Sequence, residues 1–235
     1  MGRRRDIETH DLSIRLTGPA VLQAQLLFLE DWHFETGDGL EDSVAFPQPE
    51  AAGRPAMQVL PSGPMYPSPT VRDLLVFALH QAERRVILST PYLVPDEAVM
   101  LALCLAVRRG VEVDVIVPQR SDLPLVDAAG RAYSREPTGE GARIHVHRAG
   151  FLHAKTLTVD DTLGMLGSAN YDIRSFRLNV EANLLLYSGE PIQALRRRQE
   201  GYIAASRLLD PDALQGQSRL GRLGEDVARL FGPLM

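Results

Sequence analysis

The segment that decides the fold reads His153-Ala154-Lys155-Thr156-Leu157-Thr158-Val159-Asp160, and six residues further on comes Gly167-Ser168-Ala169-Asn170. Its residue pattern predicts a β-strand over residues 152–159. Successive side chains of a strand point to opposite faces, so His153 and Lys155 would project from the same face. A neutral imidazole can attack phosphorus, and an ammonium beside it can stabilise the negative charge that develops on the phosphoryl oxygens. The segment therefore predicts nucleophilic chemistry at a phosphorus centre.

Three further side chains are candidates for the same site. Ser168 and Asn170 repeat the two-residue spacing, so a hydroxyl and an amide would face one way and bind phosphate oxygens. Glu181 is expected to hold the second ring nitrogen of His153 and fix its tautomer, as an orienting carboxylate does in hydrolytic triads. The predicted site thus combines a nucleophile, a cation, uncharged donors and an orienting carboxylate.

Two residues of the segment are expected to be structural. Asp160 lies at an odd separation from Lys155, so it would face away from the site and brace the turn after the strand. Gly167, directly before Ser168, is expected to have a structural role next to the site. Neither residue is expected to take part in the chemistry.

Lysine and asparagine are concentrated in this region of the chain. Of 25 basic residues only Lys155 is a lysine, and all three asparagines, at 170, 179 and 183, lie within residues 153–183. An ammonium is a compact point charge with three rotatable donors, whereas a guanidinium is a planar fork. The retention of one lysine here indicates that its function requires an ammonium.

Strand and helix patterns alternate along the rest of the chain, which predicts an α/β fold with a mixed β-sheet flanked by helices. The expected strands are 10–16, 85–90, 111–117, 143–147, 152–159, 163–166 and 180–187. The expected helices are 20–32, 68–84, 96–109, 122–134 and 191–209, with a short amphipathic helix over 219–231.

Composition excludes several classes of protein. With 45% hydrophobic and 23% charged residues the 235-residue chain is typical of a folded domain. The single cysteine, Cys104, excludes a disulfide framework, and no metal site or cofactor is expected. A net charge of −5 and a pI near 5.7 argue against nucleic acid as a partner. No apolar run is long enough to cross a membrane, and no signal peptide is recognised, so a cytoplasmic location is expected.

The motif H-x-K-x4-D with G-S-x-N resembles the signature of the phospholipase D superfamily, and its surroundings resemble the cardiolipin synthase branch. The resemblance rests on Ser62-Gly63-Pro64, Thr90-Pro91-Tyr92-Leu93-Val94-Pro95-Asp96, Arg109-Gly110-Val111, Gly150-Phe151-Leu152-His153-Ala154-Lys155-Thr156, Gly167-Ser168-Ala169-Asn170-Tyr171-Asp172-Ile173-Arg174-Ser175-Phe176 and Leu178-Asn179-Val180-Glu181. It covers about residues 58–205.

The resemblance implies a phosphatidyltransferase or phosphodiesterase that acts through a phosphohistidine and needs no cofactor. The implied substrate is a phospholipid similar to phosphatidylglycerol. Peripheral contact of the chain with the inner face of a bacterial membrane is an alternative that stays open. The roles transfer to His153 as nucleophile or acid, to Lys155, Ser168 and Asn170 as phosphate-binding residues, and to Glu181 as the residue that orients the histidine.

One departure from this family matters. Members of this branch carry two such motifs, one in each half, whereas this chain has one. Residues 1–34 resemble the end of a first half, residues 35–58 read as a linker, residues 59–209 as the catalytic half-domain and residues 210–235 as a tail helix.

Three alternatives stay open at this point. The chain could complete its site as a homodimer, it could be a fragment that needs a complementary half-domain, or it could be a module that only binds phosphate or lipid head groups. A single-motif nuclease or phosphodiesterase is a further alternative. The acceptor, which could be water, glycerol or phosphatidylglycerol, is not defined by the sequence.

Overall fold

The computed structural model describes residues 8–39, 46, 48–50, 53, 55–66, 68–211 and 219–232. Within them, one eight-stranded mixed sheet has the order β12-β6-β5-β3-β8-β9-β11-β2. Its strands are β2 (Met57–Ser62), β3 (Arg85–Ser89), β5 (Glu112–Pro118), β6 (Arg143–His147), β8 (Lys155–Val159), β9 (Leu163–Gly167), β11 (Glu181–Leu186) and β12 (Ser206–Leu208). The expected α/β class is confirmed.

The sheet has a parallel part and an antiparallel part. Strands β3, β5 and β6 pair in parallel, while β8, β9, β11 and β2 form antiparallel pairs. The two parts join where β3 pairs antiparallel with β8. The strand that carries Lys155 therefore lies at the centre of the sheet.

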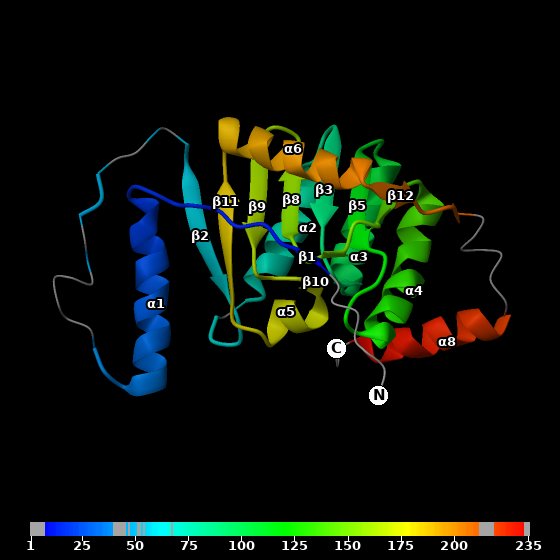
Figure 1. Cartoon of the computed structure of the whole chain (residues 1–235), viewed down its shortest axis with the longest axis horizontal. Helices are drawn as coiled ribbons and strands as arrows, with labels where there is room; N and C mark the ends of the chain where they lie inside the picture. Colours follow the sequence, from blue (N-terminus) through cyan, green and yellow to red (C-terminus); the bar gives the residue numbers. More distant parts are fainter. Residues whose placement is uncertain are drawn as a thin grey trace.

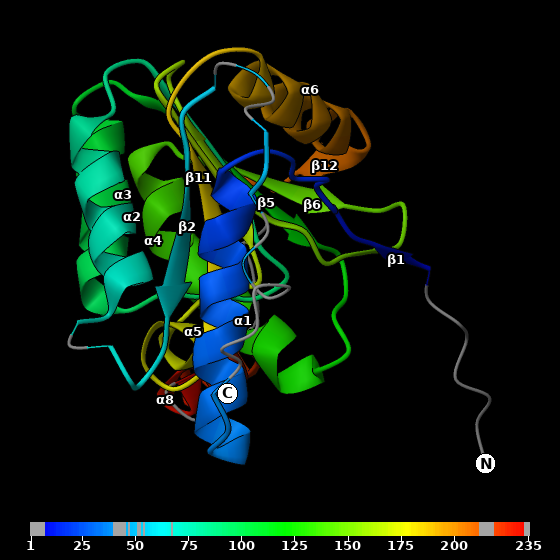
Figure 2. The same cartoon turned by 90° about the vertical axis from the view of Figure 1, so that its left-hand side faces the viewer.

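Helices cover both faces of this sheet (Figures 1 and 2). The helices α2 (Thr70–Gln81), α3 (Glu97–Arg108) and α4 (Pro124–Glu140) lie on one face, and α6 (Glu190–Ala204) lies on the other. The main core, which includes Leu75, Leu103 and Leu157, fills the space between the sheet and α2 and α3. The short α5 (Ile173–Arg177) and the terminal α8 (Arg219–Leu230) lie toward the lower end of the sheet in Figure 1.

Most element boundaries agree with the sequence patterns to within a few residues, and the start of α3 is an example. Asp96 has an extended backbone, and its Oδ1 accepts from the Val99 N–H at 3.0 Å, which is the N-cap expected at this position. Two predicted helices have wrong ends. The helix expected over 122–134 continues to Glu140, past Pro137, and the helix expected over 191–209 ends at Ala204. The residues after Ala204 form β12, which pairs with β6.

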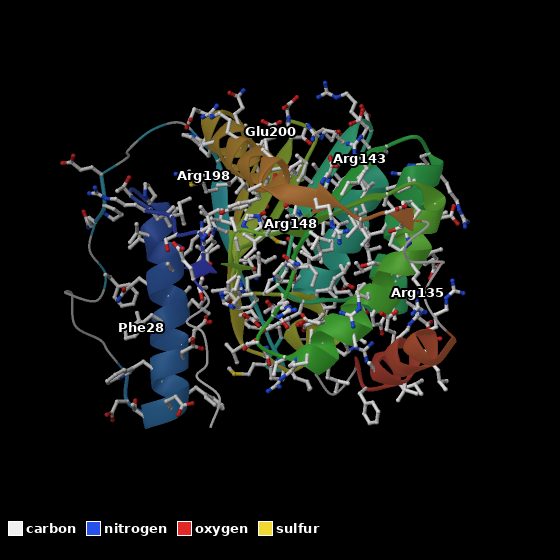
Figure 3. The ribbon with its side chains drawn as sticks, turned by 45° about the vertical axis from the view of Figure 1, so that its right-hand side comes forward. Phe28, Arg135, Arg143, Arg148, Arg198 and Glu200 are labelled. Atoms are coloured by element: carbon white, nitrogen blue, oxygen red, sulfur yellow. The ribbon has the colours of Figure 1, made fainter. Side chains whose placement is uncertain are left out.

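The amino-terminal region also departs from the prediction. In place of the strand expected over 10–16, the structure has a two-residue strand, β1 (Thr9–His10). It pairs in parallel with β7 (Phe151–Leu152). Helix α1 (Ala20–Thr36) forms where expected and lies beside β2, with Gln23 Oε1 accepting from the Val59 N–H. None of its residues is buried, and Phe28 is 52% exposed (Figure 3). β2 begins at Met57, so the last two residues of the predicted linker belong to the sheet. Residues 1–7 of the segment that resembles the end of a first half lie outside the described residues.

The terminal helix α8 packs on α4 through ion pairs. Arg135 contacts both Glu225 and Asp226, and Arg131 Nε lies 2.8 Å from Glu225 Oε1 (Figure 3). The guanidinium of Arg229 lies 4.7 Å from the centre of the Tyr133 ring. The helix expected over 219–231 is therefore present, and charged contacts hold it against α4.

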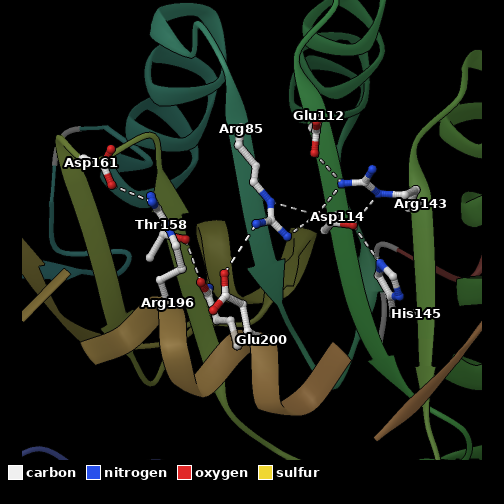
Figure 4. Close-up of polar contacts among 10 residues, drawn as sticks. Arg85, Glu112, Asp114, Arg143, His145, Thr158, Asp161, Arg196 and Glu200 are labelled. Carbon is white, nitrogen blue, oxygen red and sulfur yellow. Dashed lines mark hydrogen bonds and ion pairs between the residues drawn. The ribbon is translucent and has the colours of Figure 1, made fainter. Parts of the chain in front are cut away.

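A buried charge cluster joins the parallel strands (Figure 4). Asp114 in β5 is 1% exposed and accepts hydrogen bonds from Arg85, Arg143 and His145. Burial opposes its charge, but these three partners hold the pKa of Asp114 far below its ordinary value. The carboxylate thus remains ionised and ties β3 and β6 to β5.

Candidate active site

His153 lies at a break in the strand that the sequence predicts over residues 152–159. β7 ends at Leu152 and β8 begins at Lys155, so His153 and Ala154 belong to neither strand. The Ser89 hydroxyl lies 3.0 Å from the Ala154 carbonyl oxygen, to which it donates, and 2.7 Å from Thr156 Oγ1. The continuous strand is therefore a wrong prediction, because residues 151–152 pair with β1 whereas β8 pairs with β3 and β9.

A buried polar network centred on a residue of α6 holds the start of β8. The Gln199 side chain is fully buried, and its Nε2 donates to Thr156 Oγ1 and to the Ile87 carbonyl oxygen. Thr158 Oγ1 donates to Gln199 Oε1 at 2.6 Å. Every polar atom of this amide has a partner, so the network fixes the start of β8 without leaving an unsatisfied group.

Lys155 brings an ammonium against the imidazole of His153, as the pattern predicts. Its Nζ lies 2.8 Å from His153 Nε2, 3.0 Å from Nδ1 and 2.7 Å from the His153 carbonyl oxygen. Because Nζ is nearly equidistant from both ring nitrogens, it is not aligned with the in-plane lone pair of either one. The ammonium and the imidazole therefore lie on the same side of the chain and contact each other.

The ammonium of Lys155 is held in an unfavourable environment. The residue is 7% exposed, and burial lowers the pKa of Lys155 to about 8, although Asp11, Glu181 and Asp172 act in the opposite direction. Among the described residues, no carboxylate forms an ion pair with it. A negatively charged ligand would supply the charge that this pocket lacks.

The carboxylate that contacts His153 is the one of Asp11, which the sequence analysis did not identify. Asp11 Oδ2 lies 3.0 Å from His153 Nδ1. Glu181, which was expected at this position, instead accepts from Asn179 Nδ2 at 3.1 Å. The expected contact of Glu181 with His153 is therefore replaced, although Glu181 remains close enough to influence the charge of Lys155. No pattern in the sequence indicates Asp11, because it lies 142 residues from its partner.

Ser168 and Asn170 follow the end of β9, directly beside the start of β8. Lys155 pairs with Gly167 across the two strands, which places Ser168 next to the ammonium's strand. The Ser168 hydroxyl contacts the backbone of Ala182, accepting from its N–H at 2.9 Å. Asn170 lines a cavity of about 140 Å³, and its buried Oδ1 has no partner.

Gly167 is required by the close approach of β9 and β11. A Cβ at this position would lie 2.3 Å from Asn183 Oδ1 and 2.5 Å from the Ala182 carbonyl oxygen. Any side chain would push the loop with Ser168 and Asn170 away from β11. The need for glycine here is steric, since the backbone of Gly167 lies in an ordinary strand.

Asp160 lies at the far end of β8 and faces away from the site. Its carboxylate accepts from the backbone N–H groups of Glu83, Arg84 and Arg85, at 2.8–2.9 Å. These bonds keep the pKa of Asp160 low against the opposing effect of burial. Its backbone has φ +47°, a strained value for a residue other than glycine. Asp160 thus anchors the residues that lead into β3.

Two further facts concern ligands and location. In the parts of the chain that the structure describes, no three His, Cys, Asp or Glu side chains are grouped so that they could hold a metal ion. None of the helices described is both long and apolar enough to pass through a bilayer.

The mixed sheet with helices on both faces, and a histidine–lysine pair at the start of a central strand, define an α/β domain of the phospholipase D superfamily. Residues 75–202 match the family described as "Cardiolipin synthase, PLD-like domain", and the chain belongs to this family. It is 35% identical to Cardiolipin synthase A of Pectobacterium carotovorum over 229 residues, which are 96% of this chain and 47% of the relative. The chain thus spans about half the length of the curated relatives it matches.

Solved structures share the fold at low sequence identity. One is Nuc from Salmonella typhimurium, a phospholipase D family member, with a TM-score of 0.55 and 20% identity over 66% of this chain and 99% of that one. Another is phosphatidylserine synthase from Haemophilus influenzae Rd KW20, with a TM-score of 0.58 and 15% identity over 79% of this chain and 47% of that one. The fold class is therefore found in proteins of this superfamily.

Proposed function

We propose that this chain is the catalytic half of a phosphatidyltransferase that moves a phosphatidyl group through a covalent bond to His153. The observation that carries the proposal is the ammonium of Lys155, which is buried, lacks an ion-pair partner among the described residues and lies 2.8 Å from His153 Nε2. A phosphodiester anion would both compensate this charge and come within reach of the imidazole. The cardiolipin synthase relatives favour a phospholipid as its source.

The first step forms a bond between His153 Nε2 and phosphorus and breaks the bond from phosphorus to the leaving alcohol. As the phosphate enters, its oxygens accept hydrogen bonds from the Lys155 ammonium, which lies 2.8 Å from Nε2 and so brings phosphorus close to this nitrogen. Lys155 then stabilises the charge that develops on these oxygens, and Ser168 and Asn170 bind the same group. In the second step an acceptor hydroxyl attacks phosphorus, and the bond to Nε2 breaks.

The leaving alkoxide needs a proton, and the acceptor hydroxyl must lose one. Lys155 is the chain's single lysine, so no other histidine in the sequence is followed by lysine two residues later. We propose that a second imidazole carries these protons and that it comes from another half-domain or from a second copy of the chain. Residues 59–209 would be the catalytic half-domain, with residues 1–34, 35–58 and 210–235 as its flanking segments.

The experiment uses a phosphatidyl ester of p-nitrophenol, because nitrophenolate leaves as a stable anion and needs no proton. We expect the chain by itself to release a burst of one equivalent of nitrophenolate and to retain an acid-labile phosphatidyl group on His153, detected by mass spectrometry. With phosphatidylglycerol as the substrate, the monomer should release no glycerol.

His153→Gln is the control, since it keeps a polar side chain but removes the nucleophile. Absence of the burst in a folded chain would contradict the proposal. A burst that survives in His153→Gln would do so as well. Analytical ultracentrifugation in the same buffer then separates the two sources of the second imidazole, because only a dimer would turn over phosphatidylglycerol without an added half-domain.

A further inference from the structure

Two short parallel strands bring the amino-terminal segment to the catalytic histidine. β1 pairs with β7 in the register Thr9 to Phe151 and His10 to Leu152. The same register continued by one residue places Asp11 opposite His153. Backbone bonds fix this register at both ends: the Phe151 N–H donates to the Glu8 carbonyl oxygen and the His153 N–H donates to that of His10, each at 2.8 Å.

The side chains at this position contact each other directly. Asp11 Oδ2 lies 3.0 Å from His153 Nδ1, and the second carboxylate oxygen accepts from the Leu12 N–H at 2.9 Å. Burial works against the charge of this carboxylate, but the hydrogen bonds from His153 and Leu12 hold the pKa of Asp11 below its ordinary value. Asp11 therefore lies at His153 as an ionised acceptor.

We propose that Asp11 is the positioning residue of His153. The carboxylate accepts from Nδ1–H, which fixes the tautomer in which Nε2 carries the lone pair that attacks phosphorus. The inference rests on the function proposed above and adds the source of the orienting carboxylate, which is a segment outside the catalytic motif. The Lys155 ammonium lies 2.8–3.0 Å from both ring nitrogens, so the imidazole contacts a cation as well as the Asp11 carboxylate.

Glu181 is the other carboxylate near this site, but its contacts serve a different purpose. It accepts from Asn179 Nδ2, and Asn179 also accepts from Arg174 Nε at 3.2 Å. This chain of contacts ties Glu181 to the residues that follow α5. Its expected effect is on the charge of Lys155 and not on the tautomer of His153.

Gly150 is the residue that allows β1 to reach this position. Its φ is +111°, and a Cβ would lie 2.5 Å from the Glu8 carbonyl oxygen, which is the acceptor for Phe151. An alanine here would therefore displace β1 from β7. Gly150→Ala thus removes the Asp11 contact while Asp11 itself remains in the chain.

The test compares Asp11→Asn with Glu181→Gln and with Glu8→Gln, which removes a carboxylate from the same segment without touching His153. The tautomer of His153 is read from the chemical shifts of its isotope-labelled ring nitrogens. A structural change that leaves the contact between Asp11 and His153 in place would not alter these shifts. We expect the unaltered chain to show hydrogen on Nδ1, and Asp11→Asn to shift the population toward hydrogen on Nε2. Glu181→Gln and Glu8→Gln should retain the tautomer of the unaltered chain, and Gly150→Ala should behave like Asp11→Asn.

The nitrophenolate burst is measured in parallel on each variant. Asp11→Asn should slow it roughly 10²- to 10⁴-fold, while Glu8→Gln should leave it unchanged. If Glu181→Gln changes the tautomer and Asp11→Asn does not, the inference is overturned and the burst of the unaltered chain still stands for the function. If the tautomer responds to Asp11→Asn but no variant gives a burst, the positioning contact holds and the proposed chemistry fails.

Discussion

Two buried charged residues of the same sheet, Asp114 in β5 and Lys155 in β8, have opposite electrostatic environments. Asp114 is surrounded by Arg85, Arg143 and His145, which hydrogen-bond it and keep it ionised. Lys155 is 7% exposed, but its ammonium contacts an imidazole and a carbonyl oxygen, and burial lowers the pKa of Lys155 to about 8. The first charge is compensated within the fold, whereas the second forms no ion pair among the described residues. The difference separates a charge that connects three strands from one that stays available to an anion, as the proposed function requires.

Of the changes that test this comparison of the two charges, Lys155→Arg is expected to have the largest effect. A guanidinium is planar and longer than an ammonium, so it cannot lie over the imidazole and reach the phosphoryl oxygens from the same place. We expect the nitrophenolate burst to slow by roughly 10²- to 10³-fold, although the net charge is retained. Circular dichroism confirms the fold of the variant, and a burst at the normal rate would show that any cation suffices at this site.

The second prediction concerns the compensated charge. Asp114→Asn removes the buried negative charge and replaces one of the two acceptor oxygens by an NH2 donor that faces other donors. We therefore expect it to lower the free energy of unfolding by about 3 kcal/mol. Glu112→Gln is the matched control, because Glu112 pairs with the same Arg143 from the same strand but is 60% exposed. Denaturant unfolding should separate the two variants clearly. Equal losses in both would mean that the burial of Asp114 does not matter.

The third prediction is the converse for Lys155, where removal of the charge should stabilise the protein. Folding lowers the pKa of Lys155 from 10.5 to about 8, so between these values the unfolded chain binds more protons and stability rises with pH. At pH 7 the charged group opposes folding, by an amount on the order of 3 kcal/mol. Lys155→Met should therefore unfold at higher denaturant concentration at pH 7 than the unaltered chain, and the gain should shrink as the pH rises from about 8 to 10.5. A destabilised Lys155→Met would show that its hydrogen bonds outweigh the cost of burial.

The smallest effect is expected in the pH dependence of the burst. The ammonium form of Lys155 is lost as pH rises through about 8, so the rate should fall by about tenfold for each pH unit above this value. Stopped-flow measurement of nitrophenolate between pH 6 and 10 checks this. A rate that stays constant to pH 10 would indicate that substrate binding restores the charge of Lys155.

The predictions from sequence succeed where a local pattern has a local cause. The N-cap at Asp96, the buried strand β5 and the helix over 219–231 follow from side chains within a few residues of each other. The pairing of His153 with Lys155 was also predicted from a two-residue spacing. It holds even though His153 lies outside β8, because the Lys155 ammonium contacts the ring and the carbonyl oxygen of His153.

The failures share one physical cause, which is that distant residues act at the same place. β7 pairs with β1 while β8 pairs with β3 and β9, β6 pairs with the residues after Ala204, and the pairing of β1 with β7 brings Asp11 to His153. None of these contacts has a signal in the local sequence. Residue type limits what a side chain can bind, but the backbone register decides which partner it meets.

The sequence by itself therefore determined the chemical inventory: one lysine next to one histidine, with hydroxyl, amide and carboxylate groups close behind, in an α/β frame. Only the tertiary structure decided that Asp11 and not Glu181 contacts the imidazole, and that Lys155 is buried with an uncompensated charge. The reason is that a pKa and a hydrogen-bond partner depend on which parts of the chain exclude water from a group, and packing between segments more than a hundred residues apart sets that.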